Sequence, residues 1–197
     1  YLVSQAFVDG FYIKPRIDLD LLRRHSEGLI GLSACLAGEI PRRLVNGDYD
    51  GAKEYALTMQ DILGEGNFYL ELQDHGIPQQ ITVNRGLLRL HQETGIPLVC
   101  TNDAHYLRKE DAESHDVLLC IQTGKTVDDE NRMRYEPQNF YIRSTEEMEE
   151  LFAGYPEAVE NTQRIADRCR FDFTFGKYHL PEFQLPEGYD SPTYLRE

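Results

Sequence analysis

Residues 98–106, LVCTNDAHY, run from an apolar stretch directly into an aspartate and a histidine two positions apart, Asp103 and His105. If the apolar residues form a strand and the extended conformation continues, side chains two residues apart point to the same side. A carboxylate and an imidazole aimed at one place can bind a metal, contact a phosphate or hold a water molecule. The sequence of the neighbouring segments is needed to distinguish these roles.

Metal-binding or acid–base side chains follow each of three segments that we predict to be strands. Cys35 follows the predicted strand 29–33, Asp74 and His75 follow Phe68–Leu72, and Asp103 and His105 follow 98–101. In parallel α/β folds the functional residues gather at the carboxyl ends of the strands. Cysteine, aspartate and histidine together suit zinc or another first-row metal, and a metal-activated water can be the nucleophile of a hydrolase.

Each of these residues also has an ordinary structural interpretation. A buried, inert cysteine such as Cys35 is common, and His75 can cap the turn at Gly76. Asp103 can serve as a helix N-cap or a turn residue, and His105 as a hydrogen-bonded residue at the rim. The chain contains no His-x-His and no His-Glu-x-x-His, so three ligands do not by themselves make a multinuclear site.

Helical periodicity and glycine stop signals predict helices before, between and after these strands. The predicted helices cover 18–27, 39–45, 49–63, 79–93 and 111–123. Strands that alternate with helices imply parallel pairing through helical crossovers, and therefore an α/β sheet or barrel.

The last third of the chain has a different character. After a polar loop we predict a short strand over 140–143, a helix opened by the S-x-x-E capping box of Ser144 and Glu147, and a further helix from Pro156. We therefore divide the chain into residues 1–130 and residues 131–197, the second being a helical appendage and a linker.

The final helix begins close to the end of the sequence. We predict Ser191 as its N-cap and Pro192 as its first residue. Because the sequence stops about one turn later, we expect the chain to be a piece of a larger protein.

Composition limits the classes of function. With 197 residues and 41% hydrophobic content, the chain is long enough for one full domain. Its net charge of -14 argues against autonomous nucleic-acid binding, which needs a basic face. It allows a nucleic-acid enzyme whose binding surface lies in another domain.

The longest nearly apolar run, 28–38, is too short to span a membrane. Without a signal-peptide pattern or a CxxC pair, the four cysteines are expected to be reduced, in the cytoplasm.

Several long blocks closely resemble one family. These are EGLIGLSACLAGEIPR, NFYLELQDHGIPQQ, the run from GIPLVCTNDAHY to ENRMRY, and YIRSTEEMEELF. They are similar to the alpha-subunit family of bacterial DNA polymerase III, in its N-terminal PHP (polymerase and histidinol phosphatase) domain and the link toward the palm. The resemblance covers essentially the whole chain. It implies part of a distorted, TIM-like β/α barrel, followed by a small helical segment and a linker.

The resemblance also implies a metal centre. PHP domains hold up to three divalent metals (Zn, Mn or Mg), and the positions that match their ligands here are Cys35, Asp103 and His105. We assign no catalytic or other cofactor-binding residue. The family's His-x-His, its early barrel strands and its palm aspartates are absent from this sequence. We therefore expect an incomplete metal site and no polymerase activity for this chain alone.

Three functions stay open. The first is the PHP domain of a replicative polymerase, a metal-dependent phosphoesterase or 3′–5′ exonuclease in the intact protein. Its expected partners are DNA, reached through other domains, and clamp, proofreading or clamp-loader subunits. The second is a non-catalytic scaffold that stabilises the polymerase and binds partners. The third is a free-standing phosphatase of the histidinol-phosphatase type, against which the linker-like tail argues.

Overall fold

The computed structural model describes residues 1–178, 180 and 183–196. The strands are β1 (Gly31–Leu32), β2 (Phe68–Leu72) and β3 (Leu98–Cys100). The helices are α1 (Leu2–Val8), α2 (Leu19–Arg24), α3 (Glu39–Val45), α4 (Tyr49–Leu63), α5 (Pro78–Thr94), α6 (Ala112–Thr123), α7 (Thr145–Leu151), α8 (Pro156–Arg168) and α9 (Ser191–Tyr194), with a 3-10 helix η1 at Lys109–Asp111.

The three strands form one parallel sheet in the order β1-β2-β3, with Gly31 opposite Phe68 and Leu70 opposite Leu98. This confirms the predicted α/β class with parallel strands. The barrel is not confirmed, because the described residues form an open sheet of three strands. A barrel closes only when every strand has two neighbours, and β1 and β3 each have one.

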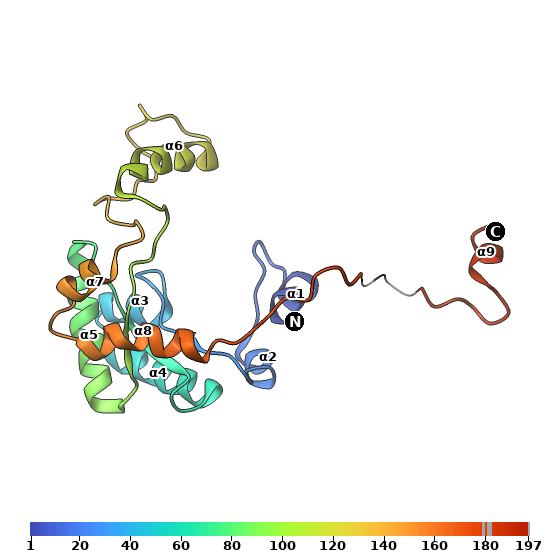
Figure 1. Cartoon of the computed structure of the whole chain (residues 1–197), viewed down its shortest axis with the longest axis horizontal. Coiled ribbons are helices and arrows are strands. Elements are labelled where there is room, and N and C mark those ends of the chain that lie inside the picture. Colours follow the sequence, from blue (N-terminus) through green and yellow to red (C-terminus); the bar gives the residue numbers. More distant parts are fainter. Residues whose placement is uncertain (179, 181–182, 197) are drawn as a thin grey trace.

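One face of the sheet holds the hydrophobic core. Residues alternate in β2, so Phe68, Leu70 and Leu72 face the helices while Tyr69 and Glu71 face the other side. The core side chains from the helices come mainly from α3, α4, α5 and α8. Figure 1 shows these helices packed together into one body. The sheet's second face is therefore free to carry polar groups toward the carboxyl ends of the strands.

Some local predictions differ from the structure. The segment 140–143 forms only an isolated bridge, between Tyr106 and Tyr141, because it meets residues 105–107 through a few backbone hydrogen bonds and no longer ladder. The N-cap of α9 is Asp190 rather than Ser191, since Asp190 Oδ1 accepts the Thr193 N–H at 2.9 Å.

Helix α6 stands apart from the body (Figure 1). On α6, Leu118 and Ile121 are exposed, whereas Leu119 and Cys120 are buried. No helix in the described part of the chain is long and apolar enough to cross a membrane. All four cysteines, each of which lies in that part, are free.

The capping box predicted for α7 is present. Ser144 Oγ accepts the Glu147 N–H at 3.2 Å, and Glu147 Oε2 accepts the Ser144 N–H at 2.8 Å. We expect Ser144→Ala to lower the free energy of unfolding by about 1 kcal/mol, because one N-terminal N–H of the helix loses its acceptor. Urea unfolding measures this. Thr145→Ala, at the exposed next position, is the control, and equal stability of the two variants would contradict the prediction.

Candidate metal centre

The carboxyl ends of β1, β2 and β3 lie at the same edge of the sheet, because the strands are parallel. A cavity of about 270 Å³ lies beyond this edge. Its lining includes Cys35 from the loop after β1, Gln73 and His75 from the loop after β2, and Asp103 from the loop after β3. The structure thus brings two of the three predicted ligands to one cavity.

Cys35 lies in a tight turn that begins just after β1. The backbone N–H of Ala34 donates to Glu71 Oε2 at 3.0 Å, and the Gly38 N–H donates to the Cys35 carbonyl at 2.8 Å. A side chain at Gly38 would place its Cβ 2.5 Å from the Ser33 carbonyl oxygen, so glycine allows this close approach. The turn leaves the Cys35 side chain half-buried at the cavity.

Asp103 is held in place through the residue before it. Asn102 Nδ2 donates to two carbonyl oxygens, of Asn139 at 3.0 Å and of Tyr141 at 2.6 Å. Asp103 itself has a positive φ of 42°, a conformation that aspartate tolerates better than most residues. The extended geometry assumed from the sequence therefore ends at Asp103, where the chain turns.

Because of this turn, His105 does not share the cavity with Asp103. His105 is exposed, is absent from the described lining, and packs against the ring of Tyr135 with centroids 4.6 Å apart. Its Nδ1 donates to the Asp103 carbonyl oxygen at 2.6 Å, so Nε2 keeps the lone pair that a metal needs. A backbone carbonyl on the second nitrogen is the usual way of orienting a metal-binding histidine.

His75 has a structural role that the sequence did not reveal. It is buried, its Nε2 donates to the Asn102 carbonyl at 2.9 Å, and its Nδ1 accepts from Gln80 Nε2 at 2.7 Å. Its ring stacks on Phe140 with centroids 4.1 Å apart. Burial lowers the pKa of His75, which favours the neutral ring. With both nitrogens engaged, His75 fixes the loops after β2 and β3 and offers no lone pair to a metal.

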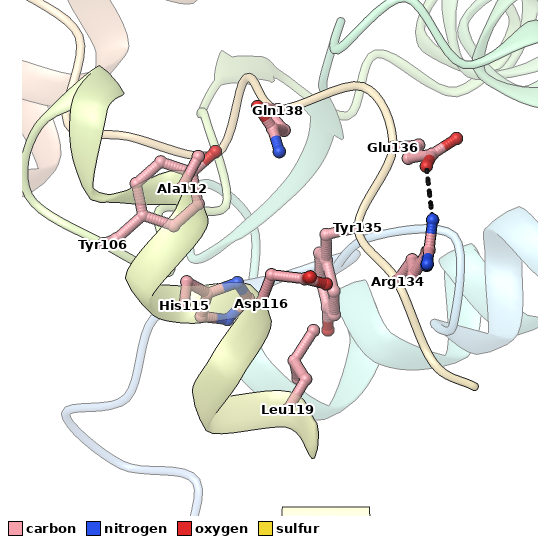
Figure 2. A pocket seen from close by; sticks show the side chains of 9 residues that line it. All are labelled: Tyr106, Ala112, His115, Asp116, Leu119, Arg134, Tyr135, Glu136 and Gln138. Carbon is pink, nitrogen blue, oxygen red and sulfur yellow. Dashed lines mark ion pairs between the residues drawn. The ribbon is translucent and has the colours of Figure 1, made fainter. Parts of the chain in front are cut away.

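A second, smaller cavity of about 70 Å³ shares three lining residues with the first. Figure 2 shows the side chains that line this second cavity. His115 and Asp116 of α6 line it, and Arg134, Tyr135 and Glu136 line both cavities. Figure 2 shows the ion pair of Arg134 with Glu136, whose Nη1 and Oε1 atoms are 3.9 Å apart. The segment 134–136 is therefore the wall between the two cavities.

Electrostatic contacts attach Arg132, two residues before this wall, to α6. Arg132, with a side chain only 3% exposed, donates from both terminal nitrogens to the Asp116 carboxylate, each at 2.6 Å. These hydrogen bonds lower the pKa of Asp116. Burial, and then the proximity of His105, lowers the pKa of His115.

The three predicted ligands offer a thiol, a carboxylate and an imidazole, a donor set that suits zinc or manganese. Cys35 and Asp103 line one cavity, and His105 lies next to Asp103 with Nε2 available. Within 1–178, 180 and 183–196, however, no three His, Cys, Asp or Glu side chains are close enough to hold a metal ion. The residues fit such a centre in chemistry, and ligation by them stays a prediction.

Glu71 is a further polar residue of this region that sequence reasoning missed. It accepts the Ala34 N–H and lies between the loops that carry Cys35 and Asp103. The signal for it was a charged residue inside the otherwise apolar strand FYLEL. A charge in a half-buried strand needs partners, and these are found only in the folded chain.

Comparison with known proteins gives one consistent result. Residues 1–75 match the PHP domain family. The chain is 46% identical over 191 residues to the DNA polymerase III subunit alpha of Borreliella burgdorferi, which covers 96% of this chain and 17% of that protein. It is 44% identical over 196 residues to the same subunit of Treponema pallidum, covering 99% of this chain and 17% of that protein.

A third relative, the DNA polymerase III subunit alpha of Thermus aquaticus, is 42% identical over 205 residues, covering 100% of this chain and 16% of that protein. The chain thus spans only 16 to 17% of the length of these relatives. The PHP match ends at residue 75, just before α5, so it includes Cys35 but neither Asp103 nor His105.

Proposed function

From the premise that this chain belongs to the alpha-subunit family of bacterial DNA polymerase III, we propose that it is a segment of a replicative DNA polymerase. In this proposal it contributes part of a metal-dependent site that cleaves phosphodiester bonds in the intact protein. The observation that supports this most is the meeting of Cys35 and Asp103 at one cavity beyond the carboxyl ends of the strands.

The proposed chemistry assigns a role to each residue of the site. In the intact protein Cys35, Asp103 and His105 would contribute ligands to a divalent-metal centre, and the metal would supply Lewis-acid polarisation of a phosphate ester when bound. The Asp103 carbonyl fixes the tautomer and orientation of His105. Arg134 lines the same cavity and can pair with a phosphate oxygen.

For the whole protein we propose DNA-directed DNA synthesis in the cytoplasm. Its proposed partners are DNA and other replicase subunits, namely clamp, proofreading or clamp-loader subunits. The net charge of -14 supports the proposal that the main DNA contacts lie outside this chain. Within it, we assign residues 1–130 to the PHP region and residues 131–197 to the helical appendage and linker. The chain on its own is then inactive as a polymerase.

Removal of a ligand tests the metal centre. In the intact protein we expect Asp103→Ala to lose bound divalent metal and to lower metal-dependent 3′–5′ exonuclease activity by about 100-fold or more, because a ligand contributes at least as much as its supporting contacts. Metal content by plasma mass spectrometry and release of a labelled 3′ nucleotide are the measurements. Asp128→Ala, in an exposed loop, is the matched control. Full metal content and activity in Asp103→Ala would refute the proposal.

The alternative is a scaffold that stabilises the polymerase and binds partners without catalysis. It is favoured by the lack of a group of three possible ligands among the described residues. In that case the intact protein, freed of any separate exonuclease, degrades no 3′ end with added Mn²⁺ or Zn²⁺. Metal-dependent degradation under these conditions would exclude the scaffold.

A further inference from the structure

Glu71 is a carboxylate in the middle of the central strand, on the face of the sheet opposite the hydrophobic core. It is half-buried, and its neighbours along the strand are apolar. A charged group in this position costs free energy unless hydrogen bonds replace its water. Its partners therefore indicate what the residue is for.

The hydrogen bonds of Glu71 reach all three strand ends. Oε2 accepts the backbone N–H of Ala34 at 3.0 Å, in the loop after β1. Oε1 accepts from Gln73 Nε2 at 3.0 Å and from the hydroxyl of Thr101, which follows β3. The Glu71 N–H donates to Ser33 Oγ at 2.8 Å. One residue thus ties the loop that carries Cys35 to the loop that carries Asp103.

The contact with Ala34 acts on a strained part of the backbone. Ala34 has a φ of 65°, in the left-handed region that a residue with a Cβ rarely adopts. This conformation sets the direction in which the next residue, Cys35, leaves the sheet. A hydrogen bond from an amide to a carboxylate is stronger than a neutral one, so it can hold such a turn.

We propose that Glu71 is a positioning residue: its carboxylate holds the Ala34 turn in the left-handed conformation and so directs the Cys35 thiol into the cavity that Asp103 also lines. That the position of the Cys35 thiol matters for function rests on the proposed metal function. That Glu71 fixes this position rests on the hydrogen bonds of its carboxylate. Glu71 is not itself assigned as a ligand. Both its oxygens accept from N–H or O–H donors, and it is absent from the described lining of the 270 Å³ cavity.

The four cysteines allow a direct test in the purified protein. Cys35 is half-buried, Cys169 is exposed, and Cys100 and Cys120 are buried. Burial raises the pKa of the Cys100 thiol to about 12, so Cys100 reacts only when the core opens. The rate of alkylation by iodoacetamide, resolved for each cysteine by peptide mass spectrometry, therefore separates opening of the Cys35 turn from unfolding.

We expect Glu71→Ala to raise the alkylation rate of Cys35 about 10-fold over wild type, relative to the rate at Cys100 in the same sample. Glu71→Gln should raise the rate less than Glu71→Ala does, because its amide oxygen can still accept the Ala34 N–H although its amide nitrogen cannot accept from Gln73 and Thr101. Glu54→Ala, at an exposed position of α4, is the matched control and should leave the rate unchanged. A Cys35 rate in Glu71→Ala within about twofold of wild type, or an equal rise at Cys100, overturns the proposal.

Glu71→Asp provides a second variant if the alanine variant does not fold. It keeps the charge but is one methylene shorter, so it no longer reaches Ala34, and the Cys35 rate should rise about threefold. A wild-type rate at Cys35 in this variant also overturns the proposal.

Cobalt binding separates this proposal from the metal function. Co²⁺ that protects Cys35 from alkylation in the wild type, and protects it less in Glu71→Ala, supports both. Faster alkylation in Glu71→Ala with no Co²⁺ binding in the intact wild-type protein keeps the positioning role and rejects the metal centre. Co²⁺ protection in both proteins, with the same Cys35 alkylation rate in wild type and Glu71→Ala when no metal is added, rejects the positioning role alone.

Discussion

Leu87→Ala is expected to lower the free energy of unfolding by about 3 to 4 kcal/mol. Leu87 lies on α5, is fully buried, and packs in the core between the helices and the sheet. The substitution removes apolar contacts and leaves a cavity, because the surrounding structure relaxes only in part. A small open sheet depends on helix packing for its stability, so little can compensate for the loss.

Urea unfolding followed by far-UV circular dichroism measures this change. Leu57→Ala is the matched control. Leu57 lies on α4 and is 42% exposed, so its substitution should cost less than about 1 kcal/mol. If the two variants lost the same free energy, the assignment of Leu87 to the core would be wrong.

The second large effect is expected for His75→Ala, with a loss of about 3 kcal/mol in the free energy of unfolding. The substitution removes the ring that stacks on Phe140 and leaves the Asn102 carbonyl and the Gln80 side chain without their partner. Buried polar groups that lose a hydrogen bond bear the cost of their desolvation. The exposed His25 offers the control, and His25→Ala should be nearly neutral in the same urea titration.

The pH dependence of stability identifies the His75 contribution. Burial lowers the folded-state pKa of His75 below 6.5, its ordinary value in the unfolded chain. Between these two values the unfolded state binds more protons, so stability falls as the pH drops below about 6.5 and is retained above it.

We therefore expect the wild type to lose more stability between pH 7.5 and 5 than His75→Ala does. The pKa of His115 is lowered in the same direction, but His115 is present in both proteins, so the difference reports His75. Parallel stability curves for the two proteins would show that His75 carries no such shift.

The sequence by itself determined the local structure of this chain. Helix α4, capped by Asp48 and ended at Gly64, and the capping box of Ser144 and Glu147 follow from residues within a few positions of one another. Strand β2 was likewise evident from its apolar run. The parallel direction of the strands could be predicted because helices separate them in the sequence. Parallel strands place Cys35 and Asp103 at one edge of the sheet.

Only the tertiary structure decided which polar residues fix the loops at that edge of the sheet. The contact of Glu71 with Ala34 joins residues 37 positions apart, and the contact of His75 with Asn102 joins residues 27 positions apart. Contacts over such distances in the sequence leave no periodic pattern of the kind that identifies helices and strands. The turn at Asp103, which moves His105 out of the cavity, depends on the anchoring of Asn102 by the distant segment 139–141. Contacts of this kind exist only once the loops have packed together, because each donor needs an acceptor that the local sequence does not supply.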